Sequence, residues 1–346
     1  MSMERIKTSI LYSLQEKPMN FWKLLAENQY LLGDFLKVLN ELYEQGMITI
    51  KNNKLCLSEK AKKELNKKAS KFSVKICDKC NGKIVLPGKK FEEILKIFKK
   101  ISKQHPPILA EFYQGRIIPE DTLKRVALMH KYGDVVDKSI VLIGDDDLLS
   151  IALALTELPK RIVVFDIDER FEKFFNEINK KYKLNIEFVQ YDVANPLPKT
   201  FLRKFDVFSC EPLETDSGFK AFFARGAACL KDYGSGYIGL TRLEVSMKRW
   251  AKFEKFFIDN GFVITDIIRD FSWYYDSERK EEREEYEQFV KMLKFDPGKN
   301  PKVCWYKASL LRIESLGKHK TAIPWNKKIK IIPVDEESFT HPSLNE

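Results

Sequence analysis

Three consecutive aspartates follow a short apolar segment near the middle of the chain. The segment Val141–Ile143 leads into Gly144 and then into Asp145–Asp147, and an apolar, helix-like run extends over Leu148–Leu158. A strand, a glycine turn and a helix form the opening unit of a Rossmann-type domain, whose ligand lies at the carboxyl ends of the strands. Such loops usually present backbone N–H groups to an anion. Three carboxylates repel an anion and attract a cation, so the loop predicts a nucleoside-like ligand that carries positive charge.

Each of the three strands predicted next also ends in a carboxylate. These are Asp166 and Asp168 at the end of residues 161–168, Asp192 near the end of residues 186–193, and Glu211 near the end of residues 206–212. About 20 residues separate Gly144 from Asp166, the spacing at which an acid binds ribose hydroxyls in this fold. The alternative for each acid alone is a solvated strand end or a helix cap. Their shared position favours one acidic site along one edge of the sheet.

The rest of the chain completes an α/β sheet of the Rossmann-like, methyltransferase type. We expect helices at residues 218–230 and 244–260 and strands at residues 236–241, 262–271 and 303–313. A pair of adjacent late strands is how the methyltransferase-type variant of the sheet finishes. The chain has no G-x-G-x-x-G motif, and a pyrophosphate would meet the three aspartates, so NAD binding is disfavoured.

These acidic segments resemble those of one enzyme family. The segments Gly144–Asp147, Phe165–Arg170, Tyr191–Asp192 and Cys210–Glu214 are similar to those of the branched-chain polyamine synthases, the N(4)-bis(aminopropyl)spermidine synthases of thermophiles. The resemblance covers nearly the whole chain, and the Gly-Asp-Asp-Asp loop is its most specific element. It implies transfer of an aminopropyl group from decarboxylated S-adenosylmethionine to the internal secondary amine of spermidine. The products would be a branched polyamine and 5′-methylthioadenosine, with no metal and no further cofactor.

The more distant linear spermidine synthases suggest roles for single residues. By that likeness Asp147 holds the donor's ammonium group, Asp166 the ribose and Asp192 the adenine. Their catalytic aspartate falls on Glu211, which is here a glutamate followed by proline. Because of that difference, Asp145–Asp147 also stay candidates for the catalytic carboxylate.

Two further segments are candidate borders of the site. Tyr113 and Gln114, just before the Rossmann part, are placed as a gate by analogy with related synthases. Trp273 lies in the aromatic run 271–275, where rings can hold ammonium groups by cation–π attraction; ordinary packing is the equal alternative. The predicted catalytic residues are therefore Asp147, Glu211 and Asp146. The predicted substrate site comprises Gly144, Asp145, Asp146, Asp147, Asp166, Asp168, Asp192, Glu211, Tyr113, Gln114 and Trp273.

The chain divides by composition into three parts. Residues 1–100 form a winged-helix-like domain with a connector, residues 101–315 the Rossmann-like catalytic domain, and residues 316–346 a polar tail. In the first part we expect three short helices and a hairpin that turns at Asn52-Asn53. The tail is either mobile and solvated or a flap whose acids at residues 335–337 fold over a polycation.

Charge is concentrated in the first part. Residues 1–100 hold 21 Lys/Arg against 11 Asp/Glu, an excess equal to the net charge of +10 of the 346-residue chain. A winged helix can place a helix in the DNA major groove. The predicted third helix carries Lys37 alone, so we favour packing or dimerisation, and a homodimer, over nucleic-acid binding.

Composition otherwise indicates a cytoplasmic enzyme. No apolar run is long enough to cross a membrane, no signal peptide is apparent, and the Lys- and Glu-rich composition is a weak sign of a hot habitat. Cys77 and Cys80 have metal-ligand spacing, but a structural zinc needs four ligands and no second pair exists. No metal site is therefore expected, and a remnant zinc knuckle, a disulfide or a site shared in a dimer all stay open for this pair.

Two alternative functions stay open. A methyltransferase that uses ordinary S-adenosylmethionine shares the fold, although the carboxylate of that donor would face Asp145–Asp147. A winged-helix regulator that senses a polyamine through the Rossmann domain would account for the basic N-terminal part.

Overall fold

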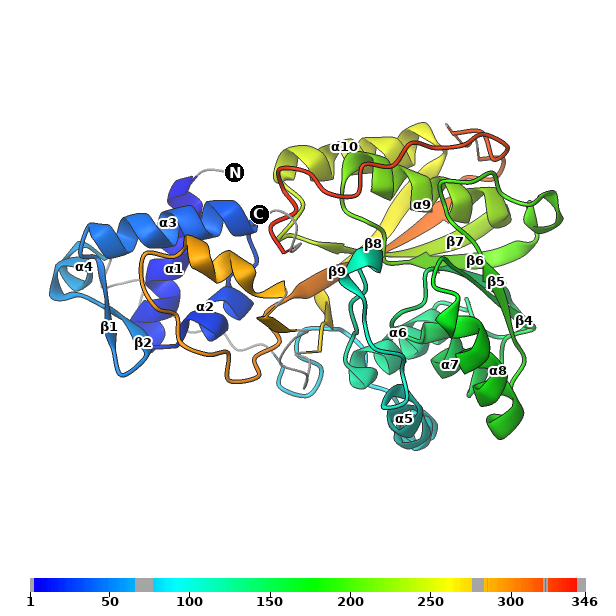
Figure 1. The fold of residues 1–346 in the computed structure, drawn as a ribbon, viewed down its shortest axis with the longest axis horizontal. Helices are drawn as coiled ribbons and strands as arrows, with labels where there is room; N and C mark the ends of the chain where they lie inside the picture. Colours follow the sequence, from blue (N-terminus) through cyan, green and yellow to red (C-terminus); the bar gives the residue numbers. More distant parts are fainter. Residues whose placement is uncertain are drawn as a thin grey trace.

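The computed structural model describes residues 3–65, 77–275, 283–284, 286–319, 321 and 323–340. A small helical body formed by the first part of the chain lies beside a larger body built on a seven-stranded sheet (Figure 1). None of the described helices is long and apolar enough to cross a membrane.

The N-terminal body has the element order that the sequence predicts. Its elements are α1 (Met3–Glu16), α2 (Phe21–Glu27), α3 (Leu32–Glu44), β1 (Ile48–Lys51), β2 (Lys54–Leu57) and α4 (Glu59–Glu64). Asn20 caps α2, because its side chain accepts a hydrogen bond from the backbone of Lys23 at 2.8 Å. Asn52 and Asn53 both have positive φ, the conformation that a tight hairpin turn requires. Its classification as a winged helix stays a prediction.

The sheet has the strand order β5-β4-β3-β6-β7-β9-β8. Its strands are β3 (Ser139–Ile143), β4 (Arg161–Asp166), β5 (Ile186–Gln190), β6 (Phe205–Cys210), β7 (Leu230–Thr241), β8 (Phe262–Trp273) and β9 (Lys307–Ser315). The first five strands pair in parallel, and β9 lies antiparallel between β7 and β8. This arrangement confirms the predicted α/β, methyltransferase-type sheet. The main difference in extent is β7, which begins at Leu230 and not at Gly236.

Helices cover both faces of the sheet. On one side lie α5 (Lys89–Ser102), α6 (Pro119–Lys131), α7 (Leu149–Ala154) and α8 (Arg170–Tyr182), and on the other α9 (Asp216–Cys229) and α10 (Met247–Asp259) (Figure 1). Alternate residues of β3 serve the two layers, since Ile140 and Leu142 belong to one core cluster and Val141 and Ile143 to the other. Burial on both faces explains the continuous apolar sequence of this strand.

Helix α5 packs with the sheet body. Ile94, Phe98 and Ile101 belong to the core cluster shared with α6 and α7. The expected division at residue 100 therefore falls inside this helix. Three short 3₁₀ turns complete the elements: η2 (Ala110–Phe112), η3 (Lys199–Phe201) and η4 (Gln288–Met292).

The N-terminal body is attached to the sheet body by hydrogen bonds and a shared apolar core. The backbone of Leu32 donates to Leu243 O at 2.8 Å, and Gln29 donates to Trp305 O at 2.9 Å. Asn40, on α3, both donates to Met292 O and accepts from Lys294 N, each at 2.9 Å. Helix α3, the helix that would read DNA in a winged helix, is thus engaged by residues around η4.

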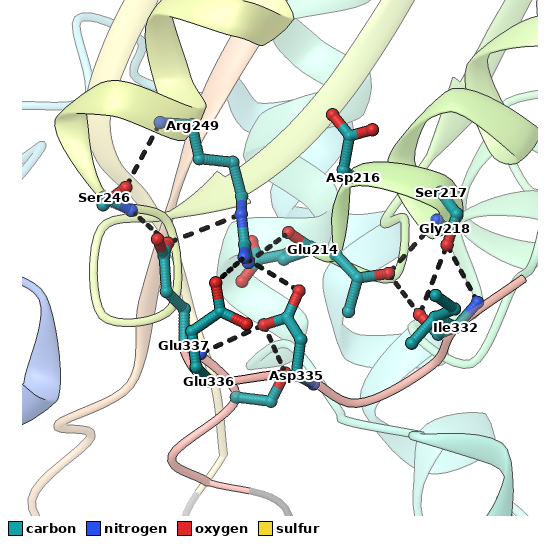
Figure 2. A network of polar contacts seen from close by, with 12 residues as sticks. Glu214, Asp216, Ser217, Gly218, Ser246, Arg249, Ile332, Asp335, Glu336 and Glu337 are labelled. Carbon is teal, nitrogen blue, oxygen red and sulfur yellow. Dashed lines mark hydrogen bonds and ion pairs between the residues drawn. The ribbon is translucent and has the colours of Figure 1, made fainter.

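The segment after β9 runs along α9 and α10 (Figure 1). Arg249 of α10 pairs with Asp335 at 2.8 Å and with Glu337 at 3.5 Å (Figure 2). Thr215 donates to Ile332 O at 2.6 Å. The fully buried Arg225 of α9 donates to the carbonyls of residues 193, 324, 325 and 327. The described part of the tail is therefore held to the sheet body, and two of its acids are neutralised by a protein arginine.

The packing of α3 generates a prediction about nucleic acid. Full-length protein should show no sequence-specific binding to duplex DNA, and only weak attraction that salt abolishes, because the docked face of α3 cannot enter a groove. Fluorescence anisotropy with random and promoter-derived duplexes over a salt series measures this. A footprint at a defined sequence would contradict it and favour the regulator.

Candidate active site

A cavity lies where the carboxyl ends of the parallel strands meet. Its lining combines acids with aromatic rings, and the acids and aromatic residues are Asp146, Glu211, Glu214, Glu244, Glu287, Tyr113, Tyr274, Tyr275, Tyr286, Trp305 and Tyr306. Strands β3 and β6 are neighbours, and Ile143 pairs with Cys210. The aspartate loop and Glu211 therefore leave the sheet at the same level, at the position where the strand order reverses and ligands bind in this class of fold.

Gly144 permits the turn that starts the aspartate loop. Its φ is +79°, a conformation that favours glycine. Asp145 turns inward, where its carboxylate accepts hydrogen bonds from the backbone and hydroxyl of Ser150. Its own N–H donates to Asp166 at 3.0 Å. Asp145 thus ties the loop to α7 and β4 and does not line the cavity.

Asp146 is the loop aspartate that lines the cavity. One of its carboxylate oxygens accepts from the backbone of Gly115 at 2.7 Å, and its carbonyl contacts His105 Nε2 at 2.7 Å. Burial, and then repulsion by Asp147, raise the pKa of Asp146 well above its ordinary value. Without a ligand this group tends to hold a proton, which a bound cation would displace.

Asp147 and Glu211 meet at one arginine. Arg125 Nη1 lies 3.4 Å from Asp147, and Arg125 Nη2 forms an ion pair with Glu211. The second oxygen of Glu211 accepts from Tyr274 Oη at 2.9 Å. Burial raises the pKa of Glu211, and Arg125 opposes that rise. A Cβ at position Gly239 of β7 would overlap the Glu211 carboxylate, so Glu211 could keep this position only with a glycine there.

Asp166, Asp168 and Gln114 form a connected group beside the loop. Asp166 accepts from the backbone of Asp145 and Asp168, at 3.0 and 2.9 Å. Gln114 Nε2 donates to Asp168 at 2.8 Å, and Arg170 pairs with the same carboxylate. Burial raises the pKa of Asp166. Burial also opposes the charge of Asp168, but the hydrogen bonds from Arg170 and Gln114 outweigh it and lower the pKa.

Three predicted site residues have different surroundings. Tyr113 lines the cavity, in a left-handed backbone conformation with φ of +57°. Asp192 lies outside the cavity lining, and its carboxylate accepts from Ala194 N at 2.8 Å. Trp273 does not line the cavity either, and Lys83 and Lys307 lie over its ring, at 4.2 and 4.7 Å. Its neighbour Tyr274 faces the cavity in its place.

Glu214 and Glu244 extend the acidic lining beyond Glu211. Glu214 accepts from the backbone of Thr241, and Glu244 accepts from Thr340 N at 2.8 Å and from Tyr306 Oη at 3.2 Å. Burial raises the pKa of both carboxyls, that of Glu214 well above its ordinary value. Mutual repulsion contributes for Glu214. The cavity can therefore meet a ligand with several positive charges.

Sequence reasoning did not name several of these residues as site members, among them Glu214, Arg125, Glu244 and Tyr274. Glu214 ends the acidic motif 210–214 and carried a usable signal. Tyr274 lies in the aromatic run 271–275, which is a candidate border of the site, so its signal was present although Trp273 was predicted. Arg125 and Glu244 carried none, because each lies in a segment whose sequence fits a helix or a loop equally well.

The described residues contain no group of three or more His, Cys, Asp or Glu side chains arranged to hold a metal. Cys77 and Cys80 lie in a turn that the backbone hydrogen bond from Asn81 N to Cys77 O closes at 2.8 Å.

Comparison with known proteins identifies relatives of the whole chain. Residues 93–340 match the family model of the branched-chain polyamine synthase A C-terminal domain. The chain is 37% identical over 317 residues to the N(4)-bis(aminopropyl)spermidine synthase of Thermococcus kodakarensis, covering 90% of this chain and 88% of that protein. It is also 37% identical over 305 residues to the enzyme of the same name from Methanocaldococcus jannaschii, covering 86% and 84%.

A solved structure extends the likeness to three dimensions. The branched-chain polyamine synthase of Thermus thermophilus, in complex with N4-aminopropylspermidine and 5′-methylthioadenosine, superposes with a TM-score of 0.82 at 29% identity. The match covers 97% of this chain and 93% of that chain. With its acidic cavity at the edge of a methyltransferase-type sheet, the chain belongs to the branched-chain polyamine synthase family.

Proposed function

We propose that this chain transfers the aminopropyl group of decarboxylated S-adenosylmethionine to the internal secondary amine of spermidine. The products are a branched polyamine and 5′-methylthioadenosine, and no metal or further cofactor takes part. One observation carries the proposal: Asp146, Glu211, Glu214 and Glu244 line one aromatic cavity at the nucleoside-binding edge of the sheet. The names of the relatives, and the two ligands of the T. thermophilus structure, support the same chemistry.

The donor binds along the aspartate loop. Decarboxylated S-adenosylmethionine has a sulfonium and a primary ammonium but no carboxylate, so it suits a site that repels anions. Asp146 and Asp147 hold the ammonium group, since the Asp145 carboxylate is engaged by Ser150. Asp166 takes the ribose hydroxyls and Asp192 the adenine.

The acceptor binds along the other acids. Spermidine carries three amines, and Glu214 and Glu244 offer charge to an ammonium group beyond Glu211. Tyr274 and Tyr306 line the same part of the cavity and can hold ammonium groups by cation–π attraction, worth about 0.5–2 kcal/mol.

The transfer itself is a displacement at carbon. The lone pair of the secondary amine attacks the methylene carbon bonded to the sulfonium, a C–N bond forms, and the C–S bond breaks with its electrons going to sulfur. The acceptor amine must first be unprotonated, so a carboxylate orients it and accepts its proton, with Glu211, Asp146 and Asp147 as the candidates. Alignment of the two substrates supplies much of the rate, since the sulfonium is already a good leaving group.

Assembly and location complete the proposal. A homodimer in the cytoplasm fits an enzyme of small polar metabolites, and analytical ultracentrifugation measures the assembly state.

Membership of the polyamine synthase family argues against the methyltransferase alternative. The docked α3 helix argues against the DNA-binding regulator. Incubation with decarboxylated S-adenosylmethionine and a panel of polyamines, followed by mass spectrometry, tests the reaction and its acceptor together.

Donor selectivity is the first expected outcome. Decarboxylated S-adenosylmethionine should bind more tightly than S-adenosylmethionine by on the order of 100-fold, because the carboxylate of the latter meets Asp146 and Asp147. Isothermal calorimetry measures both affinities. Equal affinities would show that the aspartate loop does not select charge.

Binding should also release protons. The pKa values of Asp146 and Glu214, which lie well above their ordinary values, favour the protonated forms of these acids in the free cavity, and a polycation stabilises their charged forms. Calorimetric titrations of spermidine in buffers with different ionisation enthalpies should show release of on the order of one proton per ligand near neutral pH. Glu214→Gln should reduce that number. A heat that is the same in every buffer contradicts the idea.

Glu211→Gln and Asp147→Asn should separate two roles. Glu211→Gln should retain donor binding yet lower turnover by about 100-fold, and higher pH should partly rescue it because more acceptor is then unprotonated. Asp147→Asn should weaken donor binding and slow transfer. The matched control is Glu187→Gln on β5, since Glu187 pairs with Arg161 at the surface, and it should behave as wild type. If Glu211→Gln turns over normally at neutral pH, the catalytic carboxylate is one of the loop aspartates.

A further inference from the structure

The buried cation Arg125 lies beside two of the carboxylates assigned to the proposed ligands, Asp147 and Glu211. The side chain of Arg125, on α6, is 1% exposed. Its guanidinium forms an ion pair with Glu211, lies 3.4 Å from Asp147, and donates to Ser272 Oγ at 2.8 Å. Those three partners follow or lie in three different strands, β6, β3 and β8.

A buried arginine at this position is unfavourable for ligand binding by itself. Its positive charge repels the ammonium groups of a polyamine, and removing a guanidinium from water is costly unless good partners compensate. The partners do compensate here, since attraction to Glu211 and Asp147 outweighs burial and raises the pKa of Arg125. The arginine therefore stays charged, and its effect falls on the two carboxylates.

We propose that Arg125 is a positioning residue, which holds the carboxylates of Asp147 and Glu211 at a fixed separation while the cavity is empty. The inference rests on the proposed function, because it assigns Arg125 to the alignment of donor and acceptor in that reaction. A planar guanidinium suits this task, since it can bind two carboxylates in one fixed plane.

The contacts of Glu211 show how its carboxylate is fixed. One oxygen faces Arg125 and the other accepts from Tyr274, so rotation of the carboxylate would lose one of the two bonds. Gly239 leaves the space that this rotamer occupies. Ser272 lies near the end of β8 and Tyr274 directly follows that strand, so the same end of β8 positions the partner of the arginine and the tyrosine.

The charge state of Glu211 makes the effect of Arg125 on activity depend on pH, which a merely structural role would not do. Burial raises the pKa of Glu211, and Arg125 lowers it. Without Arg125 the pKa rises further, so Glu211 is protonated up to a higher pH and cannot accept a proton there. The loss of activity should therefore be large at low and neutral pH and smaller at high pH.

The experiment compares Arg125→Met and Arg125→Lys with Arg312→Met. Arg312, on β9, is a matched buried arginine that pairs with Asp134 at 3.0 Å and does not line the cavity. For each variant the ratio of kcat/KM to that of wild type is measured across pH, together with Tm. Arg125→Met should lose about 100-fold or more at neutral pH, and the ratio should recover as pH rises. Arg125→Lys keeps the charge without the planar fork, so it should lose rate with a smaller change in pH profile.

Arg312→Met should lower Tm and leave the ratio flat across pH. If the Arg125→Met ratio is also flat, or if Arg125→Met turns over as wild type, the proposal is wrong although the enzyme still transfers aminopropyl groups. A wild-type protein that transfers nothing would instead refute the proposed function.

Infrared spectroscopy decides the inference without any substrate. At neutral pH Arg125→Met should show an additional protonated carboxyl band compared with wild type, and the double variant Arg125→Met, Glu211→Gln should lack it. No additional band, or one that Glu211→Gln leaves in place, overturns the role given to Arg125 whether or not the reaction is confirmed.

Discussion

Carboxylates that share a water-poor edge of the sheet dominate the electrostatics of this protein. Each of Asp146, Glu211 and Glu214 is raised in pKa by burial and by repulsion from its neighbours. An empty cavity of this kind is unfavourable for folding, and the fold stabilises it with backbone donors, arginines and tyrosine hydroxyls. Cations that enter the cavity reduce this electrostatic repulsion. The same repulsion that destabilises the free protein therefore favours binding of a polycation.

The topology supplies the alignment that these charges need. Strands β3 and β6 are parallel neighbours, so the loop after Ile143 and the acid after Cys210 start side by side. The antiparallel strand β9 then brings β8 to the same end of the sheet, where Tyr274 meets Glu211. Rigid, fully buried strands fix the starting points, and short loops carry the chemistry. Such placement makes the distance between the aspartate loop and Glu211 a property of the sheet rather than of a flexible segment.

The sequence predicted the strands and the acids that follow them, because buried parallel strands are continuous apolar runs and their ends are marked by polar residues. It did not predict the direction of each side chain. Asp145 points to Ser150 while Asp146 points to the cavity, a difference that the turn decides and residue type does not. Trp273 and Tyr274 differ likewise, since successive strand residues face opposite sides. The sequence did not indicate that Arg125 belongs to the site, because an arginine on an amphipathic helix usually lies in solvent.

An internal amine requires a different shape of acceptor cavity from a terminal amine. The acceptor chain must continue in two directions from the reacting nitrogen, so the catalytic acids cannot lie at the closed end of a tunnel. Segments from distant parts of the chain line this cavity. Tyr286 lines it and donates to the carbonyl of Gln114, and Thr340 lines it and donates to Glu244. Glu211 lines the same cavity, so in the proposed reaction it orients a secondary amine flanked by two arms towards the sulfonium.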